Sequence, residues 1–335
     1  MKALGLSRRP KGKHADREAA EFSLEFKDIP TPEIPTGEAL IRVRMAGICR
    51  TDQELVKGYM SFSGVPGHEF VGEVVEVDSA AGSQAKELIG KRVVGEINCG
   101  CGTCDYCHSG LERHCPQRTV LGIKGRDGAF AEYLTLPVNN LHVVPDTVDD
   151  QTAVFTEPLA AALEILEQVR VKLDDGVLVI GDGKLGLLIA RILQLHGCRL
   201  LCLGSHPHKI ELLKSWGIEA ANYRDYQPVP CDLAVEASGS TQGFAIAVSA
   251  LKARGTLIFK STYAETLTFD VAPLVVNEIT VIGSRCGPFA PALRLLSQNL
   301  IPTNQLISRI YPFDEAIAAF QYAAQGDALK VLLQF

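Results

Sequence analysis

The sequence lacks any long apolar run. No stretch approaches the roughly 18 uninterrupted apolar residues of a membrane-spanning helix, so we expect none. The N-terminal stretch MKALGLSRRPKGKHADREAAEF has only a short, weakly apolar start before its charged residues. A secretory signal has a longer apolar core, so this stretch does not predict one.

Blocks of like charge are also missing. The chain has 33 Lys and Arg against 39 Asp and Glu, for a formal net charge of −6. With no basic cluster, the sequence gives little support for a nucleic-acid or membrane partner. Hydrophobic residues make up 47% and charged residues 21%, which excludes disordered, collagen-like and coiled-coil classes.

Cysteine, in contrast, is abundant, with ten residues. In a long chain without a signal sequence, thiols and metal ligands are more expected than a disulfide framework. The sequence therefore predicts a reducing compartment and a cytoplasmic location.

A length of 335 residues predicts two domains, because a single core stops growing at about 250–300 residues. The first third is rich in short β-branched runs such as 39–45 and 70–77. From about residue 159, strands alternate with helices, which indicates an α/β fold with a doubly wound parallel sheet. The expected strands of this sheet are 177–180, 200–203, 233–237, 256–259 and 280–283, and a closing strand is expected at 330–334.

A glycine loop, Gly181-Asp-Gly183-Lys184-Leu185-Gly186, follows the first of these strands and opens an expected helix. Such a loop turns tightly, lets a pyrophosphate approach the backbone, and packs the helix against the strand. The sequence therefore predicts dinucleotide binding; the alternative is a purely structural turn.

Four cysteines with short spacing, Cys101, Cys104, Cys107 and Cys115, can close a tetrahedral zinc site with no open position. Such a site would hold a loop in place and take no part in the reaction. Disulfides and a [4Fe–4S] cluster are the alternatives. We expect the nearby Cys99 to be a bystander.

A more dispersed set consists of Cys49, His68, Glu69 and Glu157. Zinc accepts thiolate, imidazole and carboxylate ligands together. Adjacent residues of a strand point to opposite faces, so His68 and Glu69 need a turn at Pro66–Gly67 to act together. Each residue alone is also compatible with an ordinary buried thiol or polar group.

In their order and separation, these motifs resemble the zinc-dependent medium-chain dehydrogenase/reductase family of alcohol and polyol dehydrogenases. The resemblance covers essentially the whole chain. It implies a GroES-like, partly open β-barrel catalytic domain over 1–158, a Rossmann domain over 159–287, and completion of the catalytic domain by 288–335.

The family pattern implies two Zn²⁺ ions. Cys49, His68 and Glu157 would bind the catalytic zinc, with Glu69 beside it, exchanging with Glu157 or a water. The four clustered cysteines would bind the structural zinc. Glu157 resembles the polyol and sugar branch, and the run from Cys49 to Gly58 resembles glucose dehydrogenases.

The implied activity is NAD(P)-linked interconversion of an alcohol, polyol or sugar hydroxyl with its carbonyl, by a homodimer or homotetramer. Thr51 is expected to take the hydroxyl proton, and Asp52 to accept the second ring N–H of His68. Arg50 and Lys330 are expected to meet the pyrophosphate. The relay histidine of classical alcohol dehydrogenases is replaced by Glu54. The alternatives are a relative that binds cofactor without turnover, or one that uses the fold for another reaction.

The turn after strand 200–203 concerns cofactor choice. A Rossmann domain that prefers NAD places an acidic residue there, but this turn contains Gly204, Ser205, His206 and Lys209. The turn is similar to the Gly-Ser-Arg turn of NADP-dependent relatives. It predicts NADP(H) as the preferred cofactor with NAD(H) as the second; the alternative is no preference.

Overall fold

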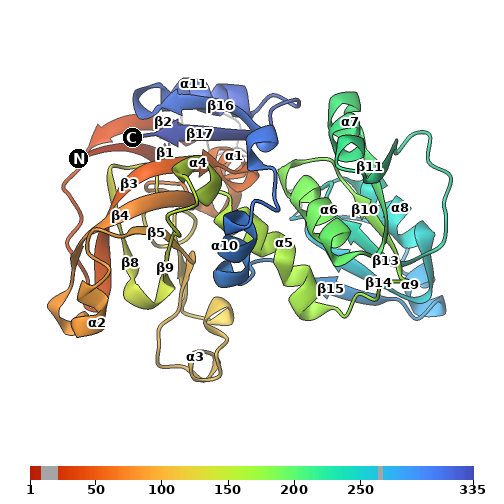
Figure 1. Cartoon of the computed structure of the whole chain (residues 1–335), viewed down its shortest axis with the longest axis horizontal. Helices are drawn as coiled ribbons and strands as arrows, with labels where there is room; N and C mark the ends of the chain where they lie inside the picture. Colours follow the sequence, from red (N-terminus) through yellow and green to blue (C-terminus); the bar gives the residue numbers. More distant parts are fainter. Residues whose placement is uncertain (9–21, 263–266) are drawn as a thin grey trace, which may run out of the picture. The chain divides into compact units, whose positions relative to one another are not determined.

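The computed structural model describes residues 1–8, 22–262 and 267–335 (Figure 1). Contacts divide the chain into two units, Met1–Glu157 with Ala292–Phe335, and Pro158–Pro291. We refer to them as the first and second unit. Of the N-terminal stretch examined for a signal, residues 2–8 form a strand and residues 9–21 lie outside the described part.

The first unit is built on a seven-stranded sheet in the order β16-β17-β3-β4-β5-β9, with β8 paired to β3. Two small two-stranded sheets, β1-β2 and β6-β7, accompany it. Its strands are β1 (Lys2–Arg8), β2 (Phe22–Asp28), β3 (Glu38–Ile48), β4 (Glu69–Val77), β5 (Arg92–Gly95), β6 (Asn98–Cys99), β7 (Thr119–Val120), β8 (Tyr133–Pro137), β9 (Leu141–Val143), β16 (Ile307–Pro312) and β17 (Lys330–Gln334).

The helices of the first unit are short. They are α1 (Arg50–Val56), α2 (Ser83–Lys86), α3 (Asp105–His108), α4 (Asp150–Ala153) and α11 (Ala316–Ala323). Two longer helices, α5 (Thr156–Gln168) and α10 (Phe289–Ser297), run across the points where the chain passes from one unit to the other.

The second unit contains a six-stranded parallel sheet in the order β12-β11-β10-β13-β14-β15. This is the doubly wound order, in which the sheet grows outward in both directions from its first strand, β10. Its strands are β10 (Gly176–Ile180), β11 (Arg199–Gly204), β12 (Glu219–Asn222), β13 (Cys231–Glu236), β14 (Leu251–Phe259) and β15 (Thr280–Gly283). Its helices are α6 (Lys184–His196), α7 (Pro207–Ser215), α8 (Thr241–Ala250) and α9 (Ala272–Val276).

Apolar strands explain this sheet. Leu178, Val179 and Ile180 of β10 are all buried, as expected for a central parallel strand covered on both faces. Helix α6 contacts β10 and β11, α7 contacts β11 and β12, and α8 contacts β10, β13 and β14. The predicted fold class is confirmed, and each predicted strand of this sheet is present.

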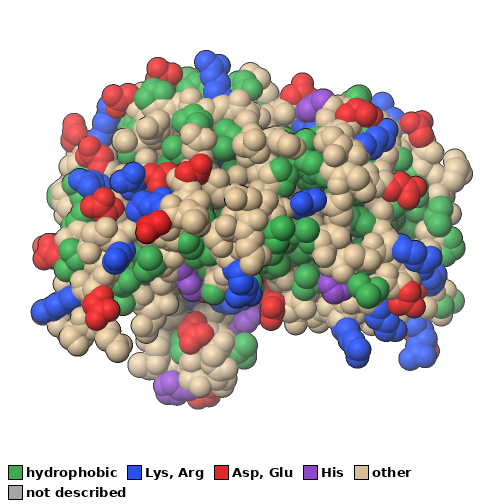
Figure 2. All heavy atoms as spheres, in the orientation of Figure 1, with side chains coloured by type: hydrophobic (Ala, Val, Ile, Leu, Met, Phe, Trp, Pro, Cys, Tyr) green, Lys and Arg blue, Asp and Glu red, His purple; other side chains and the backbone are tan. Residues whose placement is uncertain are grey.

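Within the described chain, no helix combines the length and apolar character needed to cross a membrane. On the face shown in Figure 2, acidic and basic side chains are intermixed, in keeping with the absence of like-charge blocks in the sequence.

In the first unit, Gly122 and Gly128 pack closely against the backbone of Gly67, in the segment before β4. A Cβ on Gly128 would lie 2.2 Å from the Gly67 carbonyl oxygen, and one on Gly122 would lie 2.3 Å from the same atom. The Gly67 carbonyl accepts a hydrogen bond from Ala129 N at 2.8 Å. Side chains at these glycines would push the backbones apart.

We therefore expect Gly128→Ala to lower the free energy of unfolding of the first unit by at least about 2 kcal/mol, because the added methyl group overpacks a backbone contact. Hydrogen exchange over β4 at increasing denaturant measures this. Gly90→Asn is the control: Gly90 has a φ of +78° with open space around it, and asparagine tolerates that conformation. Equal losses for the two variants would contradict the role of this close packing.

Candidate metal and dinucleotide sites

Cys49 lies between β3 and α1, at the N-cap of the helix. Asp52 fixes this position, because its Oδ2 accepts a hydrogen bond from Cys49 N at 2.7 Å. The other oxygen of Asp52, Oδ1, accepts one from Gly67 N at 3.2 Å. The fully buried Asp52 therefore connects the loop of Cys49 to the loop that carries His68.

The turn that the sequence predicts before His68 is present. Gly67 has a φ of +99°, and a Cβ there would meet the Phe130 ring at 2.8 Å, so the position needs glycine. The strand β4 begins only at Glu69. As a result, ligand atoms of Cys49, His68 and Glu69 all lie within 4.8 Å of one another.

His68 is 3% exposed, and its Nδ1 lies 3.3 Å from Asp52 Oδ1, at ion-pair distance but without the alignment of a hydrogen bond. Asp52 is therefore close to one ring nitrogen of His68, but it does not accept the hydrogen bond that the sequence analysis expects from it. Burial lowers the pKa of His68, but the charges of Asp52 and Cys49 outweigh it and hold the pKa well above its usual range.

Lys330 differs most from its prediction. The expected pyrophosphate ligand is 1% exposed, and its Nζ hydrogen-bonds to Glu69 Oε2 instead of facing solvent. Gly47 of β3 leaves room for this ion pair, since a Cβ there would lie 2.5 Å from the same carboxylate oxygen. The structure therefore places Lys330 with the group around Cys49.

The lysine stays charged at this site. Burial lowers its pKa, but Glu69, then Cys49 and Glu157, outweigh that effect and raise the pKa above its usual value. Glu157 is therefore close enough to act on Lys330 electrostatically. Its carboxylate does not join Cys49, His68 and Glu69 within the 4.8 Å grouping.

The other predicted residues near Cys49 lie on α1. Thr51 Oγ1 is 3.8 Å from Cys49 Sγ. The Arg50 side chain is 69% exposed and pairs with Glu54 at 2.9 Å, and Glu54 also pairs with Lys57 at 3.1 Å. Glu54, which stands where the family resemblance expects a relay histidine, therefore forms ion pairs with two cations, Arg50 and Lys57.

The four clustered cysteines also come together, with their sulfur atoms within 4.8 Å of one another. Cys104 Sγ lies 3.6 Å from Cys107 Sγ and 3.7 Å from Cys115 Sγ, and all ten cysteines are free thiols. A hydrogen bond from the Thr103 side chain lowers the pKa of Cys101 to about 6, which favours the thiolate form that binds metal. Cys99 is outside the group.

In the second unit, the three loop glycines meet three different demands. Gly181 has a φ of +123°, and Gly186 packs so closely that a Cβ would lie 2.0 Å from the Gly181 carbonyl oxygen. Around Gly183, at the N-cap of α6, a Cβ would have no neighbour within 4 Å. Open backbone at a helix N-terminus suits an anionic group, and Lys184 and Leu185 begin the helix there.

The turn after β11 is held by a residue of the glycine loop that the sequence analysis missed. Asp182, the second residue of the glycine loop, accepts hydrogen bonds from Ser205 N at 2.8 Å and His206 N at 2.7 Å. Lys209, expected to add positive charge at this turn, is buried. The adjacent parallel strands β10 and β11 could have signalled this, since their C-terminal ends meet at one edge.

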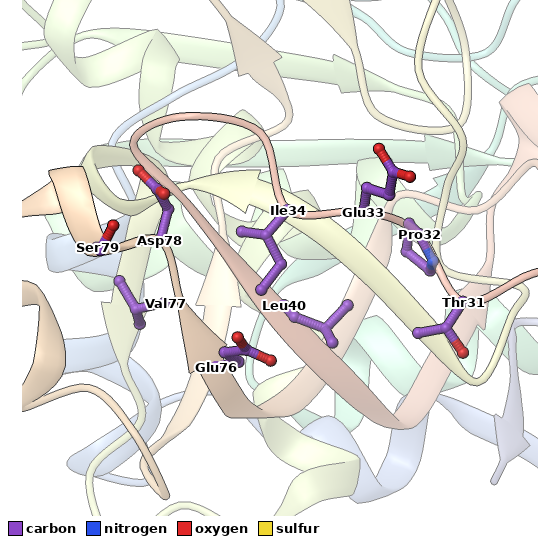
Figure 3. A pocket seen from close by; sticks show the side chains of 9 residues that line it. All are labelled: Thr31, Pro32, Glu33, Ile34, Leu40, Glu76, Val77, Asp78 and Ser79. Carbon is purple, nitrogen blue, oxygen red and sulfur yellow. The ribbon is translucent and has the colours of Figure 1, made fainter.

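A surface pocket of about 580 Å³ lies elsewhere in the first unit (Figure 3). Three carboxylates contribute to it, Glu33, Glu76 and Asp78, together with apolar side chains such as Ile34 and Leu40. Asp78 already accepts hydrogen bonds from Gly37 N and Ala80 N, at 2.9 and 3.1 Å. The pocket contains none of the predicted site residues.

Two family models match the chain. The alcohol dehydrogenase GroES-like domain matches residues 35–146, and the zinc-binding dehydrogenase domain matches residues 185–298. An L-threonine 3-dehydrogenase of Streptomyces avermitilis is 30% identical over 95% of this chain and 98% of its own. A sorbitol dehydrogenase of Halalkalibacterium halodurans is 29% identical over 93% and 95%.

Solved structures agree. A short chain alcohol dehydrogenase of E. coli CFT073 complexed with NADH has a TM-score of 0.86 and 26% identity, over 100% of this chain and 99% of its own. A protein of Sinorhizobium meliloti 1021 bound to NADP gives the same TM-score, identity and coverage.

This chain belongs to the zinc-dependent medium-chain dehydrogenase family. The predicted family is thereby confirmed, as is the GroES-like and Rossmann architecture. The predicted class of enzyme, an NAD(P)-dependent dehydrogenase of alcohols or polyols, is that of this family, and the comparisons give no support to a non-catalytic relative.

The Lys330–Glu69 pair leads to a stability prediction. Lys330→Met should lower the free energy of unfolding of the first unit by about 3–5 kcal/mol, because it leaves a buried carboxylate without a partner. The double variant with Glu69→Gln should recover much of the loss. Hydrogen exchange over β3 and β17 is the measurement. Tryptophan fluorescence would report on the second unit instead, because the only tryptophan in the sequence, Trp216, lies there.

The control for this test is the surface pair of Arg42 and Glu73, at 3.2 Å. Arg42→Met should cost less than about 1 kcal/mol, since exposed ion pairs contribute little. A Lys330→Met variant as stable as the control would disprove the importance of the buried pair.

Proposed function

We propose that this protein oxidises a hydroxyl group of a small alcohol, polyol or sugar to a carbonyl, with NAD(P)⁺ as the hydride acceptor, and can run the reverse reaction. The observation that carries this is the convergence of Cys49, His68 and Glu69 at one buried point. The relatives named for sorbitol and L-threonine support a hydroxyl-bearing small molecule as substrate.

The first unit supplies the catalytic domain in this proposal, and the second unit the dinucleotide-binding domain. Gly181, Gly183, Lys184, Leu185 and Gly186 would cradle the pyrophosphate. The open space at Gly183 and the start of α6 beside it support this role.

Zinc fits the donor set in the first unit. Cys49 and His68 offer a thiolate and an imidazole, and Glu69 and Glu157 offer carboxylates, a combination that zinc accepts. Since Lys330 engages Glu69, we assign Glu157 as the third resident ligand and Glu69 as the carboxylate that exchanges with it. When bound, zinc supplies Lewis-acid polarisation of the substrate hydroxyl.

Other residues of the chain prepare the site for this chemistry. Asp52 holds the Cys49 loop and stands beside Nδ1 of His68, which leaves Nε2 to face the metal. Thr51, whose hydroxyl is close to Cys49 Sγ, would take the substrate proton and pass it on. Lys330 offsets part of the negative charge that the carboxylates bring into a buried site.

A second zinc would be held by Cys101, Cys104, Cys107 and Cys115. Four thiolates leave no open position for a substrate, so this ion would fix the loop around α3. The same free thiols support a reducing, cytoplasmic setting.

Metal content tests the proposed zinc sites. We expect elemental analysis to find two zinc ions per chain. Cys49→Ser should lose one of them, together with nearly all turnover, because it removes a thiolate ligand of the catalytic zinc. Cys104→Ser should instead lower thermal stability while the loaded protein keeps its catalytic metal.

Cys99→Ser is the control for both variants, since Cys99 is buried near the cluster but outside it. It should keep both metals and activity. A Cys104→Ser protein that is stable but inactive would show that the division between catalytic and structural sites is wrong.

We also propose a homodimer or a homotetramer with β15 at an interface between copies. This strand ends the parallel sheet, so one of its edges is unpaired in the described chain. Val275, Val276 and Val281 on α9 and β15 are 71%, 78% and 49% exposed, which is unusual for valine.

Light scattering should therefore give at least twice the chain mass of 36.2 kDa. Val276→Lys with Val281→Lys should shift the protein toward the monomer, because two buried charges oppose association. The control is Val143→Lys, which places a lysine at an exposed valine (46%) of the first unit, away from β15 in the sequence. A monomeric wild-type protein would refute the assembly.

A further inference from the structure

Asp182 belongs to the glycine loop after β10, but its carboxylate lies against the turn after β11. It is 5% exposed, and Oδ2 accepts hydrogen bonds from Ser205 N and His206 N. His206 Nδ1 lies 3.0 Å from Oδ1 and 3.1 Å from Oδ2. One carboxylate therefore engages two backbone donors and one ring nitrogen of the same turn.

Gly204 makes room for this arrangement. A Cβ at Gly204 would lie 2.5 Å from Asp182 Oδ2 and 2.8 Å from its Cβ. The glycine of the Gly-Ser-His turn is therefore required by the protein's own carboxylate, and its small size does not leave an empty space there.

In a doubly wound dinucleotide domain, the end of the second strand is where the adenosine ribose is recognised. A 2′-phosphate needs hydrogen-bond donors and positive charge at that point. Here the N–H groups of Ser205 and His206 are already donated, and the group that accepts them is negative. A neutral ribose hydroxyl can instead donate a hydrogen bond to a carboxylate.

We propose that Asp182 determines cofactor choice, and that it favours NAD(H) over NADP(H). The inference rests on the proposed dinucleotide site and names the group that reads its adenosine end. The turn sequence alone predicts the opposite preference, because it contains no acidic residue. In this chain the acidic group reaches the turn from the glycine loop of the neighbouring strand.

Asp182→Asn is the direct test, because asparagine keeps the shape and an acceptor for the two backbone donors while removing the charge. The dissociation constants of NADH and NADPH are measured by the fluorescence of the bound reduced nicotinamide, on zinc-loaded protein without substrate. We expect wild-type protein to bind NADPH at least about tenfold more weakly than NADH, and Asp182→Asn to reduce this ratio about tenfold.

Asp174→Asn is the matched control. Asp174 is an exposed acid of the same unit, located before β10 and therefore at the opposite end of the strands. It removes the same charge and should leave the ratio within about twofold, because exposed charges are screened over a distance of about 10 Å.

Wild-type protein that binds NADPH as tightly as NADH would overturn the inference even if no variant folds. A ratio that Asp182→Asn leaves unchanged would overturn it as well. Failure to bind either dinucleotide would overturn the proposed function itself, and tight NADH binding separates that case from the other two.

Discussion

The ion pair between Lys330 and Glu69 connects the end of the chain to the donors around Cys49. Lys330 begins β17, which pairs with β3, and Glu69 begins β4 on the other side of β3. Three adjacent strands therefore meet at one buried charged contact. Because an unpaired charge is costly in this environment, the positions of Glu69 and of His68 beside it depend on the closing strand.

Much of this arrangement could be predicted from local patterns. The glycine loop after an apolar strand and the four cysteines with short spacing each specify a site within a few residues, so the structure forms both groups where the spacing indicated. The turn at Gly67 was also predictable, because His68 and Glu69 could not otherwise act on one side.

Two features escaped the sequence analysis because they depend on contacts between strands. Lys330 appears in the sequence as a cation near the chain end, and only the pairing of β17 with β3 brings it to Glu69. In the sequence, Asp182 is a variable position between two glycines of the loop. Only the pairing of β10 with β11 brings it to Ser205 and His206. Spacing along the chain carries no information about such pairs.

The first unit is made of two segments separated by the whole of the second. During synthesis, the residues of the second unit leave the ribosome as one continuous piece and can complete their sheet before β17 is made. The first unit is completed only after β17 has been made, so Glu69 gains its cation only once Lys330 has emerged. A nascent or truncated chain that stops before residue 330 would hold its metal-binding loops around an uncompensated negative charge.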